Sequence, residues 1–103
     1  EEGALADFSR AIALQPGFAF AYNGRGSVKL SLRDYRGALE DYSRAVEADP
    51  GFANSWANRG LARERLGDRV AACQDTRRAA DLGFVVAQQR LVQWGCRWVL
   101  SPP

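Results

Sequence analysis

The sequence repeats itself every thirty-four residues, and this internal repeat limits the fold more than any other feature. The segment Pro16-Gly17-Phe18-Ala19 returns as Pro50-Gly51-Phe52-Ala53. Small and acidic positions recur with the same offset, as in the pairs Gly26 and Gly60, Ala38 and Ala72, and Asp41 and Asp75. Helical repeats of this length stack so that each buries its apolar side against its neighbours. The sequence therefore predicts an all-α, right-handed solenoid of antiparallel helix pairs.

Apolar residues at three- and four-residue spacing predict about six helices, over residues 2–14, 19–32, 35–48, 53–66, 69–82 and 85–99. Pro16 and Gly67 are typical of helix ends, and Asp34 can accept hydrogen bonds from the first turn of the next helix. We interpret the last helix as a cap. The chain then divides into the second helix of a truncated repeat (1–18), a complete repeat (19–52), a complete but divergent repeat (53–86), and a capping helix with its tail (87–103).

The repeat resembles the tetratricopeptide repeat over residues 1 to about 82. The family pattern of Trp/Tyr, Gly/Ala, Tyr, Ala, Phe/Tyr, Ala and Pro is met by Tyr22, Gly26, Tyr35, Ala38, Tyr42, Ala45 and Pro50, and in the next copy by Trp56, Gly60, Ala72 and Ala79. Arg25 and Arg59 replace the usual Leu, and Thr76 stands in the place of Tyr42. The C-terminal turn, with Ala80-Asp81-Leu82-Gly83, Ala87-Gln88 and Leu91, is similar to the Sel-one-like repeat.

The resemblance implies a non-enzymatic module that binds a protein or an extended peptide on its concave face, as a scaffold or assembly factor. It assigns peptide binding to the first helix of each pair, at Phe20, Asn23, Ser27, Leu30, Asn54, Asn58, Leu61 and Arg65. Chaperone-binding members use a Lys, Asn and Arg clamp, but Asn23 and Ser27 stand at two of its places, so that partner is disfavoured. Three alternatives stay open: asparagines that only bond neighbouring helices, a structural spacer in a longer solenoid, and a recruiting domain of a larger enzyme.

Composition argues against several other classes of protein. The sequence has no His, and its two Cys have no companion ligands, so we expect no catalytic residue, metal site or cofactor. A net charge of +2 gives no support for nucleic-acid binding. No apolar run approaches the roughly 18 residues that cross a bilayer. The chain does not begin with Met, so we treat it as part of a longer protein and infer no compartment.

Two Arg and Asp pairs are expected to form ion pairs within the helix hairpins. Arg25 and Asp41, and likewise Arg59 and Asp75, fall at nearly matched heights on the two helices of one pair. We therefore predict one partly buried, structural ion pair in each repeat. Phe8 and Tyr42, from the preceding helices, are expected to cover the guanidinium faces.

The two cysteines, Cys73 and Cys96, are candidates for a disulfide. If residues 69–82 and the last helix form a hairpin that turns near Gly83, the two side chains come to similar levels on facing helices. A disulfide there would indicate an oxidising compartment. Two small buried thiols are the preferred alternative, because free Cys is among the most buried residue types. The register of this corner differs by two residues between the tetratricopeptide and the Sel-one-like spacing.

Overall fold

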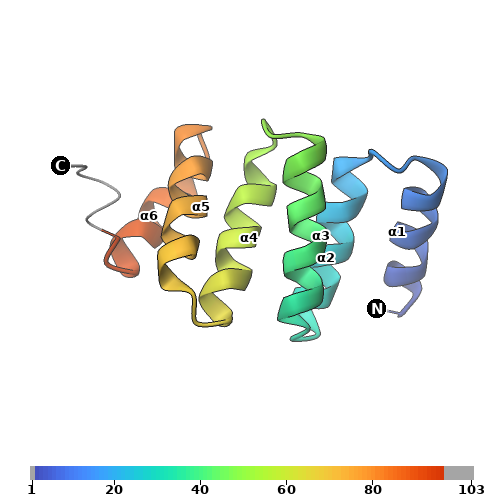
Figure 1. Cartoon of the computed structure of the whole chain (residues 1–103), viewed down its shortest axis with the longest axis horizontal. Helices are drawn as coiled ribbons and strands as arrows, with labels where there is room; N and C mark the ends of the chain where they lie inside the picture. Colours follow the sequence, from blue (N-terminus) through green and yellow to red (C-terminus); the bar gives the residue numbers. More distant parts are fainter. Residues whose placement is uncertain (1, 97–103) are drawn as a thin grey trace.

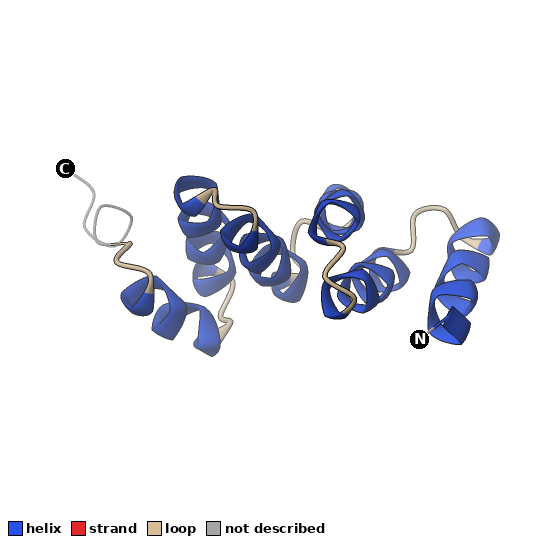
Figure 2. Ribbon diagram, turned by 90° about the horizontal axis from the view of Figure 1, so that it is seen from below, coloured by secondary structure: helices blue, strands red, loops and turns tan. Residues whose placement is uncertain are grey.

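The computed structural model describes residues 2–96, and within that range the chain forms six helices and no strand (Figure 1). The helices are α1 (Glu2–Leu14), α2 (Ala19–Ser31), α3 (Tyr35–Ala48), α4 (Ala53–Arg65), α5 (Arg69–Asp81) and α6 (Val85–Gln93). They follow one another along the long axis of an elongated molecule of 45 × 25 × 18 Å (Figures 1 and 2). Successive helices pack against each other, as α2 does with α3 and α4 with α5. The predicted all-α solenoid is confirmed.

The last helix is shorter than the sequence analysis predicted. Helix α6 ends at Gln93, and Trp94 and Gly95 form a turn in which Gly95 has φ +68°. The apolar spacing of Trp94 suggested a continuing helix, but a left-handed glycine stops it and returns the chain towards α5. The predicted end of this helix at Val99 lies outside the described residues.

Small residues let the two helices of each hairpin approach closely. A side chain at Gly26 of α2 would place its Cβ 2.8 Å from a ring carbon of Tyr42 in α3. At Gly60 of α4 the same atom would lie 2.6 Å from the Thr76 hydroxyl and 3.0 Å from the backbone oxygen of Ala72. The glycine of the repeat is therefore required because the facing helix occupies the space of a side chain.

The turns within the two hairpins use the same hydrogen bonds with different residues. Asp34 accepts from the backbone N–H of Gly37 at 3.0 Å, and Asp68 accepts from that of Ala71 at 3.2 Å, so each aspartate caps the following helix. The residue before each aspartate has positive φ, namely +88° at Gly67 but +64° at Arg33. Arginine pays a steric cost in this left-handed conformation that glycine does not.

We expect the substitution Arg33→Gly to raise the free energy of unfolding by about 0.5–1 kcal/mol, because it relieves the strained backbone at an exposed position. Equilibrium unfolding in urea, followed by circular dichroism, measures the change. The matched variant Gly67→Ala should lower stability by a similar amount, since it introduces the same strain into the second hairpin. A less stable Arg33→Gly protein would contradict this explanation.

Each hairpin contains a buried aspartate held by two basic side chains. Asp75 is 3% exposed and accepts from Arg59 Nε and Nη2, both at 2.9 Å, while Arg63 Nη1 lies 2.9 Å from its Oδ2. In the first hairpin Asp41 accepts from Arg25 at 2.9 and 2.8 Å and pairs with Lys29 at 3.1 Å. The hydrogen bonds to Asp41 raise the pKa of the Arg25 guanidinium above its ordinary value.

Each arginine also reaches the helix that precedes its hairpin. Arg25 Nη1 donates to the Ser9 hydroxyl of α1 at 3.2 Å, and Arg59 Nη1 donates to the Ser43 hydroxyl of α3 at 3.5 Å. Both predicted ion pairs are therefore present, with a serine contact that the sequence analysis did not anticipate. One side chain links three successive helices in this arrangement.

The rings near the two guanidinium groups differ from those predicted. Tyr22 lies 5.8 Å from the Arg25 guanidinium carbon, and Trp56 lies 5.0 Å from that of Arg59. Each ring comes from the same helix, three residues earlier, where side chains on one helical face are neighbours. The predicted rings have other contacts: Phe8 fills the space beside Gly24, and Tyr42 faces Gly26.

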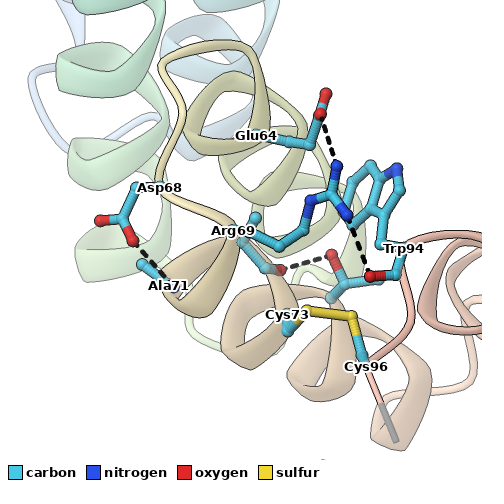
Figure 3. The surroundings of a disulfide bond; sticks show 9 residues. Glu64, Asp68, Arg69, Ala71, Cys73, Trp94 and Cys96 are labelled. Atoms are coloured by element: carbon cyan, nitrogen blue, oxygen red, sulfur yellow. Dashed lines mark hydrogen bonds and ion pairs between the residues drawn. A yellow bond between two sulfur atoms is a disulfide. The ribbon is translucent and has the colours of Figure 1, made fainter.

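A disulfide joins α5 to the segment after α6 (Figure 3). Cys73 and Cys96 are both buried, with Cα atoms 5.8 Å apart, and they pack with Leu91. The structure thus has a bridge where the sequence analysis preferred two free thiols. Arg69 supports the same corner, since its Nη1 donates to the Trp94 carbonyl at 3.0 Å and its Nη2 pairs with Glu64 at 3.3 Å (Figure 3).

Candidate functional site

The first helices of the successive hairpins, α2, α4 and α6, supply one side of the solenoid. Residues at three- and four-residue spacing on one helix share a face. On α4 this spacing places Asn54, Asn58, Leu61 and Arg65 together, and on α2 it places Asn23, Ser27 and Leu30 together. Hydrogen bonds from α4 to α2 and from α6 to α4 connect these stripes. We call this surface, formed by Asn23, Asn54, Asn58, Leu61, Arg65 and Arg90, the α2–α4–α6 face.

Two asparagines of this face bond each other across neighbouring helices. Asn58 Nδ2 donates to Asn23 Oδ1 at 3.1 Å, and the buried Ser55 donates to the same oxygen at 3.3 Å. Asn23 therefore uses its acceptor inside the protein, as the structural alternative proposed. The Nδ2 group of Asn23 and the Oδ1 atom of Asn58 have no hydrogen-bond partner within residues 2–96, so each asparagine has one polar atom that these residues do not use.

Three of the predicted peptide-binding residues have contacts elsewhere. The Ser27 hydroxyl lies 3.0 Å from the Tyr42 hydroxyl of α3, and burial raises the pKa of this tyrosine above its ordinary value. Leu30 packs against the core cluster that contains Tyr42. Phe20 is 59% exposed and lines a groove beside Phe18 and Phe52, where the hairpins connect.

The sequence analysis missed Arg90 of α6, although it is the most unusual cation of this face. Its Nη1 donates to the Ala57 carbonyl of α4 at 3.4 Å, and no carboxylate pairs with it in the described part of the chain. Burial lowers the pKa of Arg90 below its ordinary value, and the positive charge of Arg65 lowers it further. A half-buried arginine in these surroundings gains stability when an anion approaches, because the anion offsets both effects.

A shorter offset between the last two copies of the repeat explains why Arg90 was overlooked. The turn after α5 contains Leu82 and Gly83, so Phe84 follows Phe52 by thirty-two residues. The backbone before α6 nevertheless matches the starts of α2 and α4, since Phe18, Phe52 and Phe84 all have φ between −84° and −78°. With the shorter offset Arg90 aligns with Asn58, and this alignment was the available signal.

The described residues contain neither a metal-ligand cluster nor a membrane-spanning helix. No group of three or more Cys, Asp and Glu side chains within residues 2–96 is arranged to hold a metal ion. Among the helices of this range, none is both long and apolar enough to cross a membrane. The polar chemistry of the α2–α4–α6 face consists of amide groups, one uncompensated arginine, and Arg65, which pairs with Glu64 at 2.6 Å.

The comparisons with known proteins support the fold through solved structures. No protein-family model matches the chain, and no curated protein matches its sequence. The first TPR of Spaghetti (RPAP3), bound to HSP90 peptide SRMEEVD, superposes with a TM-score of 0.84 at 20% identity, over 90% of this chain and 75% of that one. Two crystal structures of MamA match with TM-scores of 0.76 and 0.73, at 31% and 28% identity, over 84% and 89% of this chain. This chain covers 51% and 48% of those MamA chains, about half of their length.

The fold and the repeating network of small residues therefore define a helical-repeat solenoid. The solved structures show that this solenoid has the fold of tetratricopeptide-repeat proteins, in agreement with the resemblance of the residue pattern to that repeat. The Sel-one-like resemblance at the C-terminal turn is not confirmed by these comparisons.

Proposed function

We propose that this chain is a non-enzymatic interaction module that binds an extended, carboxylate-bearing segment of a partner protein along the α2–α4–α6 face. The observation that carries this proposal is Arg90, a half-buried cation beside Arg65 without a carboxylate partner among the described residues. An acidic group of the partner would pair with Arg90. This pairing would offset the cost of partial burial and the repulsion from Arg65.

The other residues of the face suit an extended backbone. The free polar atoms of Asn23 and Asn58 offer one donor and one acceptor, and the exposed Asn54 offers an amide one turn earlier on α4. Leu61 supplies an apolar contact between these polar positions. The matched RPAP3 structure holds the peptide SRMEEVD, which contains three acidic residues, on the same fold. These features support a peptide-binding scaffold more than a spacer without a ligand.

The substitution Arg90→Gln tests the proposal, because it removes the charge and keeps a long polar side chain. With fluorescein-labelled SRMEEVD as the probe, we expect it to weaken binding about tenfold in fluorescence anisotropy titrations, the effect of one charge-assisted hydrogen bond. The neutral probe SRMQQVN, with an amidated C-terminus, should bind the unaltered protein more weakly than the acidic probe does.

A matched control separates this site from general electrostatics. Arg36→Gln removes the same charge from an exposed position on α3, and we expect it to leave the affinity for SRMEEVD unchanged. Equal affinity of the Arg90→Gln protein and the unaltered protein would reject the proposed role of Arg90. Equal affinity for the acidic and neutral probes would reject a carboxylate-bearing partner.

A further inference from the structure

A second surface, separate from Arg90, lies where the repeats connect. Phe18, Phe20 and Phe52 line a groove of about 470 Å³, together with Gly17, Ala48 and Asp49. The groove is formed by the starts of α2 and α4 and the end of α3, at the edge where the α1–α2 and α3–α4 connections lie (Figure 1). The rings of Phe18 and Phe20 are 5.9 Å apart, so two neighbouring aromatic side chains border the same hollow.

The exposure of these rings is unusual for an aromatic cluster. Phe20 is 59% and Phe18 is 36% exposed, whereas Phe52 is half-buried. Together they place three aromatic side chains around a space that no other side chain of the described chain fills. An aromatic ring carries negative charge density on its face, so such a space attracts a cation as well as an apolar group.

The polar part of the groove is acidic. Asp49 Oδ1 accepts from the backbone N–H of Gly51 at 3.1 Å, and its Oδ2 has no hydrogen-bond or ion-pair partner within residues 2–96. No Lys or Arg is among the residues that line the groove. The groove is therefore lined by one carboxylate and three aromatic side chains, with no basic residue in the lining.

The end of α3 adds to the negative potential. Helices α2 and α4 close with bonds from Asp34 N to Lys29 O at 2.8 Å and from Asp68 N to Arg63 O at 2.9 Å. Within the described chain, α3 has no such bond from five residues further on. Its end is closed only by the bond from Asp49 N to Ala45 O, at 2.9 Å. The last carbonyl groups of α3 thus stay open beside Ala48, and a helix C-terminus carries partial negative charge.

We infer that this groove binds a lysine or arginine side chain of a partner protein. The aromatic rings contact the apolar stem and the face of the cationic group, while Asp49 and the end of α3 supply the opposite charge. The inference is independent of the peptide site at Arg90, because the two sites share no residue and prefer ligands of opposite charge. It gives Phe20 a role at the connection between repeats, in place of its predicted role among the peptide-binding residues of the concave face.

Three small probes test the groove in the intact protein. N-acetyl-lysine methylamide and N-acetyl-arginine methylamide carry the cation, and N-acetyl-norleucine methylamide has a similar stem without charge. Titrations of ¹⁵N-labelled protein are followed through the amide signals of Gly17, Ala19 and Phe52. We expect the basic probes to bind at least about threefold more tightly than the norleucine probe, the size of an exposed cation–π contact with a weakly screened carboxylate.

Two variants identify the groups responsible. Asp49→Asn keeps the oxygen that accepts from Gly51 N and removes the charge, so it should abolish the preference for the basic probes without disturbing the turn. Phe20→Leu keeps an apolar side chain and removes an aromatic face, and it should reduce the preference about twofold. The control Glu47→Gln neutralises a nearby carboxylate that lines a different hollow, and it should bind all three probes like the unaltered protein.

Several outcomes would overturn the inference. Equal binding of the norleucine and basic probes would show an apolar groove without charge selectivity, and the absence of shifts at the three amides would show no site. Equal losses in Asp49→Asn and Glu47→Gln would show a diffuse acidic surface. The Arg90→Gln protein should retain the basic-probe binding, so failure of the peptide site and failure of this groove are separate results.

Discussion

The Asp75→Asn protein is expected to lose about 2–4 kcal/mol of its free energy of unfolding, the largest effect that we predict for a single substitution. Asp75 is buried, and its carboxylate compensates Arg59 and Arg63, whose side chains are 15% and 27% exposed. Loss of the negative charge leaves two partly desolvated cations close together. Water still reaches both of them, so the loss should be smaller than for a fully buried pair.

Equilibrium unfolding in urea measures this effect, and an exposed pair supplies the control. Asp81 pairs with Arg77 at 3.1 Å on the surface of α5, and the side chain of Asp81 is 54% exposed. Asp81→Asn should therefore cost less than about 0.5 kcal/mol. If Asp75→Asn is no more destabilising than Asp81→Asn, the buried network does not stabilise the hairpin.

Removal of the disulfide is expected to be the second large perturbation. The bridge joins residues that are 23 positions apart, and a constraint of this length restricts the unfolded chain by about 3 kcal/mol in the chain-entropy description. Cys73→Ala combined with Cys96→Ala should lower the urea midpoint accordingly. Amide hydrogen exchange should rise most in α6, because the bridge, the Leu91 contact and the Arg69 hydrogen bond hold this corner to α5.

The oxidation state itself is checked by mass measurement after alkylation without reductant. An unmodified protein that gains two alkyl groups only after reduction is the expected result. Two modified cysteines in the natively purified protein would contradict the bridge. The double alanine variant supplies the control for stability, because its urea midpoint should not respond to reductant while that of the unaltered protein should fall.

The sequence predicted most of the fold because its strongest signals are local and periodic. Pro16 and Asp34 flank helices whose bounds follow from the residue pattern, and the thirty-four-residue offset places Arg59 opposite Asp75 without a structure. The prediction of which rings lie beside the guanidinium groups was wrong for a local reason. Tyr22 and Trp56 lie one turn before the arginines on the same helix, and this proximity prevailed over rings from the preceding helix.

The C-terminal corner was harder to predict because two signals changed there together. Helix α6 begins two residues early because α5 and the connection after it are each one residue shorter than α3 and the connection after α3. This shift hid the alignment of Arg90 with Asn58. Gly95 then ended the helix, although the apolar spacing around it continued. The candidate face was therefore only partly predictable: its positions on α2 and α4 follow from the repeat, but its most informative cation does not.

The arginine that contacts three helices has a consequence for how the molecule unfolds. A solenoid whose repeats touch only their neighbours can lose its ends one hairpin at a time. Here one network joins α1, α2 and α3 through Ser9, Arg25 and Asp41, and a second joins α3, α4 and α5 through Ser43, Arg59 and Asp75. The disulfide then holds the segment after α6 to α5. Detaching α1 breaks the Ser9–Arg25 hydrogen bond, and detaching the C-terminal corner requires opening the disulfide, so fraying from either end is penalised beyond the lost apolar packing. The oxidised protein should behave as one cooperative unit despite its linear architecture.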